Sequence, residues 1–485
     1  MGEGYVYFDT GLNFTSNGKI SGLERWDNFG RILFDILPPI FHDNISYYMV
    51  FQLLTLIILA AVFFYLVKYF TKNVWISLSS TLIFCTSYSG LFEMIATGNY
   101  QRFVQRIPNL IPQLLAFLQL AKYFDNKKVK HYIYSLILFS ISIFMGHFST
   151  FLMPVFVIYP IIFSIAHKSR PKRVFTNIFL SIPFVFLNLL LISGDIFTPK
   201  GDFINFIKTN SILHITTQII LQISNMTLPA VLIAKIASVT SSYQDTMLIL
   251  TLPIIFTFFM GIYLIRKKQK NIFIIYTLSL LSLFVLLFLN LYLGKINPMY
   301  NMAGYTYYFL PNTYSSDPSL TASFKGDRYY MLPYFFISII IATLIYSVIK
   351  NKKIYKLFSI VFLIGYMYYN CGLVWKNIDR IQPVSEDLKK YLSFIKSVSP
   401  KLNNQSVLVV PKEFIWPSSM IKAIYKYPGM EFIPNDTDWK SQIINKKDII
   451  LIDFYYDKAQ SGKINVTQNR VIDLTNLINY NLPTK

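Results

Sequence analysis

Long apolar runs separated by short polar connections are the main pattern of this chain. Most runs are close to 20 residues, the length of helix that crosses a hydrocarbon core of about 30 Å. They predict ten membrane-spanning helices, at residues 48–70, 74–96, 108–123, 131–146, 149–166, 173–194, 245–265, 271–293, 330–349 and 354–375. The predicted fold class is therefore an all-α polytopic membrane protein, with residues 48–375 as its transmembrane domain.

Composition and charge support this class. Of the 485 residues, 54% are hydrophobic and 14% charged, whereas a soluble protein carries roughly a quarter charged residues. Five short connections hold eighteen basic residues and one acid, Asp125, and therefore +17 of the formal charge of +21. These basic residues are Lys68, Lys72, Lys122, Lys127, Lys128, Lys130, Lys168, Arg170, Lys172, Arg173, Arg266, Lys267, Lys268, Lys270, Lys350, Lys352, Lys353 and Lys356.

Short basic connections between apolar spans are typical of cytoplasmic loops. A nucleic-acid interface would instead gather basic residues with base-stacking partners on one folded face, so we expect no nucleic-acid partner; the expected partner is membrane lipid. Placing all five connections in the cytoplasm gives a consistent alternating path. Residues 1–47, 97–107, 195–244, 294–329 and 376–485 then fall on the non-cytoplasmic side, with both termini.

Six N-x-S/T sequons agree with this orientation. They lie at Asn13, Asn44, Asn225, Asn404, Asn435 and Asn465, all in segments predicted to be external. The motif is a weak signal by itself, but because all six agree with the orientation, we also expect the protein to be a glycoprotein.

The segment after the last span has a different composition. Runs rich in β-branched and aromatic residues at 406–410, 430–433 and 448–454 alternate with helix-like stretches at 415–426 and 437–444. This alternation predicts a small external α/β domain over 376–485 with a partly parallel sheet. No glycine-rich phosphate loop follows these strands. The cysteines, Cys85 and Cys371, both lie in predicted spans without metal-binding spacing, and we expect neither metal nor cofactor.

Candidate chemistry begins in the N-terminal external segment, 1–47. Apolar residues at helical spacing over 29–41 predict an amphipathic helix that lies in the membrane interface and ends at Pro38-Pro39. It would hold four charged residues against the membrane surface: Asp9, Glu24, Arg25 and Asp27. A carboxylate there, such as Asp9, could act as a general base on an acceptor hydroxyl. A surface helix that leads into the first span is the plainer interpretation.

Further ionisable residues fall at the predicted external boundary of the membrane. Glu93 ends the second span, Arg102 and Arg106 precede the third, and His147 lies in the turn between the fourth and fifth. Ionisable groups at such depth are costly and mark functional sites, and arginines there suit a phosphate. Alternatively, the arginines extend to the interface and His147 caps a helix.

The loop 294–329 leads directly into the ninth span. Its length favours a folded cover rather than a spacer, and it ends in Arg328 and Tyr329. Two interpretations remain open here. The pair either anchors the helix at the interface or binds a lipid phosphate and its sugar.

Three sequence segments resemble a known group of membrane enzymes. GLERWDNFGRILFDILPPIF, TGNYQRFVQRIPNLIPQLLAF and GHFST are similar to the GT-C superfamily of glycosyltransferases, and most closely to the polytopic family labelled 6-pyruvoyl-tetrahydropterin-synthase-related. The resemblance implies transfer of a sugar from a polyprenyl-phosphate donor to an external acceptor, with inversion. It implies Asp9 as the base, with Arg102, Arg106 or Arg328 near the donor phosphate. Members carry a helix before the first external loop, so we expect one upstream of Met1.

Two other classes of function stay open from the residues. One is a transporter or flippase of lipid-linked glycans, which would need a polar path between both faces. The other is a non-catalytic assembly protein whose C-terminal domain binds a partner.

Overall fold

The computed structural model describes a helical part and a small sheet. The described residues are 13–14, 20–21, 40, 45–87, 100–145, 152–168, 170–191, 211–227, 243–266, 270–292, 331–349, 353–354, 356–372, 400, 403, 406–410, 430–434, 448–456 and 466–473. They divide into two compact units. The helical unit comprises Leu53–Ile95 and Gln105–Lys376; the strand unit comprises Met1–Gln52, Ala96–Val104 and Asn377–Lys485. We describe each unit by itself.

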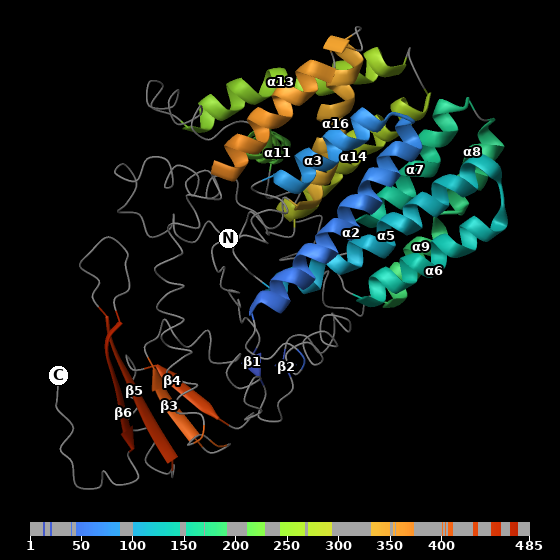
Figure 1. Ribbon diagram of the computed structural model, residues 1–485. Coiled ribbons are helices and arrows are strands. Elements are labelled where there is room, and N and C mark those ends of the chain that lie inside the picture. Colours follow the sequence, from blue (N-terminus) through green and yellow to red (C-terminus); the bar gives the residue numbers. More distant parts are fainter. Residues whose placement is uncertain are drawn as a thin grey trace. The chain divides into compact units, whose positions relative to one another are not determined.

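Successive apolar helices build the helical unit (Figure 1). They are α2 (Ile45–Thr71), α3 (Val74–Thr86), α5 (Tyr100–Asn126), α6 (Val129–Met145), α7 (Met153–Ala166), α8 (Pro171–Phe179), α9 (Ile182–Leu191), α11 (Ile212–Thr227), α13 (Tyr243–Arg266), α14 (Lys270–Tyr292) and α16 (Met331–Val348), and residues 356–372 are also helical. The first turns of α2 and α5 group with the strand unit. Four segments are long and apolar enough to cross a membrane: Val50–Thr71, Leu248–Arg266, Lys270–Tyr292 and Met331–Val348. The described residues thus fit an α-helical membrane protein, while the total of ten spans stays a prediction.

The interior of this unit is formed by α14 and α16. In the spanning segment of α16, 78% of the residues are buried, and in that of α14 61%, against 33% in α2 and 22% in α13. Phe335 of α16 lies at the centre of an aromatic cluster, with ring centroids 4.2 Å from Phe63 and 5.7 Å from Phe84. Apolar side chains on the outer faces of α2 and α13 remain exposed, as expected of helices that face lipid.

The ends of the helices that border the basic connections meet at one end of the helical unit. Tyr69, near the end of α2, donates a hydrogen bond to Asp125 at the end of α5. Lys127, just after α5, lies with its Nζ 5.7 Å from the ring of Phe163, near the end of α7. At the start of α3, the ring of Trp75 lies 5.4 Å from Nζ of Lys356.

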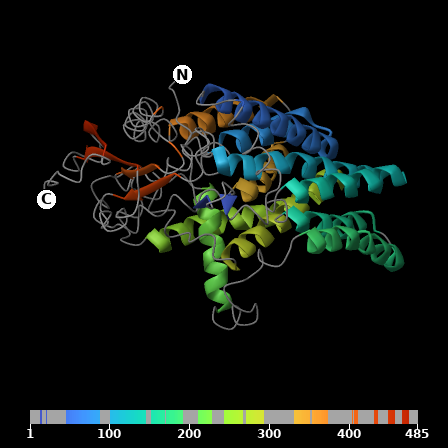
Figure 2. The ribbon, with the colours of Figure 1, turned by 90° about the horizontal axis from the view of Figure 1, so that it is seen from below.

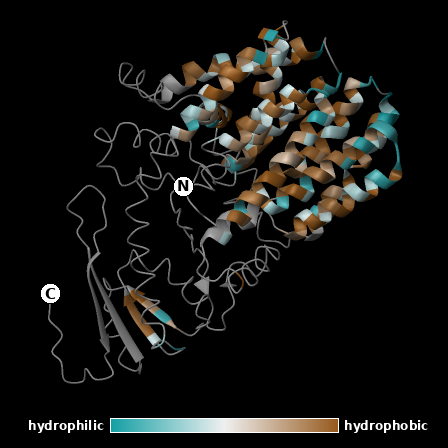
Figure 3. Ribbon diagram, viewed as in Figure 1, coloured by the Kyte–Doolittle hydropathy of each residue, from teal (hydrophilic) through white to brown (hydrophobic). Residues whose placement is uncertain are grey.

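The remaining basic connection, between α13 and α14, lies at the same end of the helical unit. Tyr276, near the start of α14, donates to the carbonyl of Phe258 in α13 at 2.6 Å. A Cβ built on Gly261, near the end of α13, would meet Tyr276 Oη and would lie 2.6 Å from Leu344, near the end of α16. Figure 3 shows hydrophilic residues gathered at the ends of these helices beside α8. The alternating path requires this one-ended arrangement, and its assignment to the cytoplasm stays a prediction.

Three of these connections begin with a lysine in the left-handed backbone region. Lys72, Lys127 and Lys168 have φ angles of 51°, 57° and 48°. They follow the last residues of α2, α5 and α7, and their backbone N–H groups close the final helical turn, from Lys72 to Lys68 O at 2.9 Å and from Lys127 to Tyr123 O at 2.7 Å. Glycine usually occupies this position because it lacks a Cβ.

Two observed helices differ from the predicted ones. The helix that contains the third predicted span starts earlier, at Tyr100 of α5, and includes Pro108 and Pro112; membrane helices tolerate proline where their surroundings satisfy the freed carbonyls. The sixth, predicted as one helix over 173–194, is broken into α8 and α9. Pro183 has no N–H to continue the ladder from α8, but it fits the first turn of α9.

The predicted external loop 195–244 contains a helix that no long apolar run in the sequence indicated. This helix, α11, packs against α13 and α14 and runs across their direction (Figure 2). Gln222 of α11 donates to Leu287 O at 3.2 Å, and Met226 O accepts from Tyr334 at 2.8 Å. The sequon at Asn225 therefore lies within a helix rather than in an open loop.

The strand unit holds a four-stranded sheet of order β4-β3-β5-β6. Its strands are β3 (Ser406–Val410), β4 (Glu431–Pro434), β5 (Asp448–Tyr456) and β6 (Val466–Asp473). The first three cover the three β-rich runs, β4 and β5 are both parallel to β3, and β6, which was not predicted, is antiparallel to β5. A separate hairpin pairs β1 (Asn13–Phe14) with β2 (Ile20–Ser21). The predicted helices at 415–426 and 437–444 and the amphipathic helix over 29–41 fall outside the described residues.

Candidate functional site

The predicted site residues fall almost wholly outside the described residues. Asp9, Glu24, Arg25, Asp27, Glu93, His147, Arg328 and Tyr329 belong to segments that the structure does not describe. Arg102 and Arg106 lie in the first two turns of α5, but their side chains are also outside the description. The helix ends that flank these residues in sequence can still be located.

Those flanking helix ends lie opposite the basic connections. Met145 ends α6 two residues before His147, and Met331 begins α16 three residues after Arg328. Both are the ends remote from the connections at Asn126–Val129 and after Val348. These two helix ends therefore lie at the end of the helical unit opposite the basic connections. We call it the remote end of the helical unit.

Buried carboxamide side chains concentrate toward the remote end. Among the described residues, Asn109, Gln113, Asn188, Gln222, Asn290 and Asn370 are buried, and all lie between the middle of the unit and its remote end. Only Asn177 of α8 is buried near the basic connections. Amides are costly to bury in lipid, so the position of these side chains distinguishes the remote half of the unit, whereas buried serine and threonine hydroxyls also lie toward the basic connections.

Two of these amides keep an acceptor atom unused. Asn188 Oδ1 in α9 and Gln222 Oε1 in α11 are buried without a hydrogen-bond partner. Most buried polar atoms in proteins are paired, and an exception points to a water or ligand. Each of these two atoms therefore marks a place in the remote half of the unit that is suited to a water or a polar group of a ligand.

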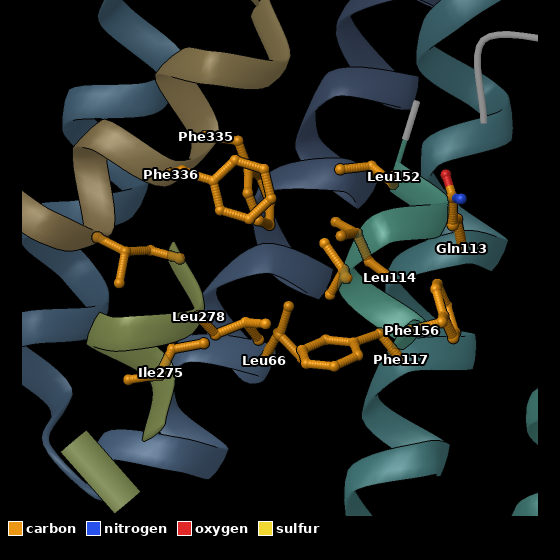
Figure 4. Close-up of a pocket in the computed structure, with 12 residues that line it drawn as sticks. Leu66, Gln113, Leu114, Phe117, Leu152, Phe156, Ile275, Leu278, Phe335 and Phe336 are labelled. Carbon is orange, nitrogen blue, oxygen red and sulfur yellow. The ribbon is translucent and has the colours of Figure 1, made fainter. Parts of the chain in front are cut away.

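The middle of the unit holds a small cavity instead. Residues of α2, α5, α7, α14 and α16 line it, including Leu66, Leu152, Leu278 and Phe336, and the Gln113 side chain borders it (Figure 4). Its volume is about 20 Å³, room for a single water. The lining is apolar apart from Gln113, so this cavity suits neither a sugar nor a charged group.

A second pocket opens where α5, α7 and α8 meet. Phe124 and Phe163 form its buried floor, and Asp125 and His167 lie beside them. Its remaining side chains are all cationic: Lys127, Lys168, Arg170, Lys172 and Arg173. We call this site the basic pocket; from the sequence, its lysines and arginines were expected to set topology and, as a secondary effect, to attract anionic lipid.

Packing of the basic pocket fixes Lys127 over aromatic rings. Its Nζ lies 4.6 Å from the ring centroid of Phe124 and 5.7 Å from that of Phe163, distances typical of cation–π contacts. His167 stacks on Phe163 with centroids 4.1 Å apart. Burial lowers the pKa of Lys127, and the charge of Arg173 lowers it further, while Asp125 acts in the opposite direction. Cations from two connections therefore share one site.

Comparisons of the chain with protein-family models, with curated proteins and with solved structures find no match. Function must therefore be argued from the arrangement of the chain's own residues.

Proposed function

We propose that the protein is a GT-C-like integral membrane glycosyltransferase that moves a sugar from a polyprenyl-phosphate donor to an acceptor on the non-cytoplasmic face. One observation carries this proposal: buried carboxamides gather toward the remote end of the helical unit. The segments that hold the predicted acid and arginines are joined in sequence to helix ends on that side. Buried carboxamides, which can bond to hydroxyl and phosphate oxygens, support a site for a sugar phosphate on this side.

The proposed reaction assigns the base role to Asp9. Its carboxylate takes the proton of the acceptor hydroxyl while the hydroxyl oxygen bonds to the anomeric carbon. The bond from that carbon to the phosphate oxygen breaks, and polyprenyl phosphate leaves with the electron pair. Arg102, Arg106 and Arg328 would stabilise the charge that develops on the phosphate.

The remaining predicted residues would complete the site. Glu24, Arg25, Asp27 and Glu93 would bind hydroxyls of the sugar or the acceptor, with His147 and Tyr329 beside the sugar ring. Carboxylates, imidazole and phenol oxygen all form hydrogen bonds with hydroxyl groups.

The test is the replacement of Asp9 by an isosteric amide. Asp9→Asn should lower sugar transfer at least about 100-fold, because a positioned general base contributes about 10²–10⁴-fold. Membranes that contain the protein are incubated with synthetic polyprenyl-phosphate sugars, and mass spectrometry follows donor consumption. Asp43→Asn, in the same N-terminal segment, is the matched control and should retain transfer. Full activity of Asp9→Asn would remove Asp9 from the mechanism.

The structure gives less support to a transporter or flippase. Such a function needs polar groups along the whole path between the two faces. Within the described part of the helical unit, the cavity at mid-depth is apolar and about 20 Å³ in volume. No observation specifically favours this second class.

A further inference from the structure

The basic pocket has an excess of unneutralised positive charge. Among the described residues, none of Lys127, Lys168, Arg170, Lys172 and Arg173 forms an ion pair with an acid. The one carboxylate in the pocket, Asp125, accepts a hydrogen bond from Tyr69. Five cations beside one carboxylate repel one another, so binding an anion would relieve the repulsion.

The short helix α8 is held firmly at the edge of this pocket. Asn177 is buried, and its Nδ2 donates to Ser164 Oγ of α7 at 2.8 Å. Where α8 ends, Tyr132 donates to Leu180 O at 2.8 Å, and Ser181 Oγ donates to Phe156 O at 3.1 Å. These bonds from α6 and α7 fix the positions of Lys172 and Arg173, which lie in the first turn of α8.

The exposed face of α8 changes from cationic to apolar along its length. Lys172 and Arg173 are exposed at its start, followed by Phe175, with 66% of its surface exposed, and Phe179, with 63%. Lys172, Phe175 and Phe179 recur at helical spacing and lie on one side. Exposed phenylalanines are stable in lipid, whereas exposed cations belong at the headgroups. The boundary between hydrocarbon and headgroups therefore crosses α8 between these two groups.

We propose that the basic pocket binds the phosphate group of an anionic membrane lipid, with Phe175 and Phe179 of α8 against its acyl chains. The charge of the pocket suits any phosphate, and the apolar face of α8 is the observation that favours a lipid over a free ion. This site contains none of the residues of the proposed transferase site, and it does not depend on that activity.

The experiment measures lipid binding to the full chain in a neutral detergent. The probes are dioctanoyl phosphatidate, dioctanoyl phosphatidylcholine and inorganic phosphate, and native mass spectrometry gives each apparent Kd. We expect saturable binding of phosphatidate that inorganic phosphate displaces only weakly. Arg173→Gln should weaken this binding about fivefold, the factor that one basic side chain usually contributes near an anionic membrane surface. Arg173→Lys should restore most of it.

Three further variants distinguish binding in the basic pocket from attraction by the general positive charge at this end of the unit. Lys127→Asn removes the cation while keeping a residue that tolerates the left-handed backbone, and it should also weaken binding. Lys128→Gln removes a charge from the adjacent exposed residue, which does not line the pocket, and it should leave the Kd nearly unchanged. Asp125→Asn removes the only acid and should tighten binding.

Three results would overturn the proposal. Equal loss of binding in Lys128→Gln and Arg173→Gln would show a diffuse surface attraction. Equal affinity for inorganic phosphate would identify a free anion as the ligand. Binding of phosphatidate unchanged by Arg173→Gln and Lys127→Asn would place the lipid elsewhere. Melting temperatures without lipid serve as the folding control for each variant.

Discussion

Helices α16 and α13 are both strongly apolar, but their surroundings differ. Both are long apolar segments that could cross a membrane, yet 78% of the residues in the spanning segment of α16 are buried and only 22% of those in α13. In α16, Phe335 and Ile339 are buried inside the helical unit, whereas in α13 Phe256 and Ile249 are two-thirds exposed. Because lipid is as apolar as these side chains, apolarity alone does not distinguish an interior helix from a peripheral one.

The difference between the two helices lies in how closely they pack. Side chains of α16 contact aromatic rings of α2 and α3. One side of α13 also packs closely, around Gly261, while its opposite side is available to lipid. Stability in this unit should therefore depend on packing and hydrogen bonds between helices. Three pairs of variants test this interpretation.

The largest difference is expected for phenylalanine truncation. Phe335→Ala would enlarge the central cavity that Phe335 lines, and Phe→Ala in a packed core costs about 3–5 kcal/mol. Phe256→Ala, at a side chain with 66% of its surface exposed, should cost less than about 1 kcal/mol because lipid replaces the lost contacts. Unfolding in mixed micelles with increasing SDS measures both free energies. Similar losses would contradict the assignment of α16 to the interior.

A smaller difference is expected for two glycines. A Cβ on Gly261 would meet Tyr276 Oη and lie 2.6 Å from Leu344, whereas one on Gly365 would meet nothing within 4 Å. Gly261→Ala should therefore cost about 1–3 kcal/mol through overpacking. Gly365→Ala should be neutral or stabilise by up to about 1 kcal/mol, since alanine favours helix. Thermal unfolding of the purified variants in detergent would show whether only one of them loses stability.

The smallest difference concerns a buried hydroxyl. Tyr276→Phe removes the 2.6 Å hydrogen bond to Phe258 O and should cost about 1 kcal/mol. Tyr65→Phe, at an exposed side chain of α2, should have almost no effect. Combining Tyr276→Phe with Gly261→Ala should give less than the sum of the two losses, because removal of the hydroxyl relieves part of the overlap. Strict additivity in a double-mutant cycle would argue against this close contact.

The sequence was a good guide to the helices and a poor guide to their contacts. Apolar runs located α13, α14 and α16 to within two residues of their observed ends, because a membrane helix must be apolar over its length. The same method missed α11, because polar residues interrupt its apolar ones: its buried side chains include both Ile215 and Gln222. It also did not detect the break before Pro183, since hydropathy averages across a proline.

The candidate sites show the same limit. The predicted path of the chain through the membrane puts four candidate residues on one side: Asp9, Arg102, Arg106 and Arg328. That they form one site stays a prediction. The basic pocket was not predicted, although each of its cations was recognised as part of a basic connection. Which of eighteen basic residues share a pocket depends on the packing of α5, α7 and α8, and no single-sequence pattern contains that information.

The lysines that follow α2, α5 and α7 show which requirement dominated at these turns. A left-handed backbone costs a residue with a Cβ about 1–2 kcal/mol, and glycine at positions 72, 127 and 168 would avoid this cost. Drawing a lysine to the centre of a bilayer costs about 2.5–3.5 kcal/mol on insertion scales. The larger penalty keeps each lysine in water, so the residue that ends the helix also prevents the helix from sliding through the membrane. A glycine-ended version would have more relaxed turns and a less firmly anchored bundle.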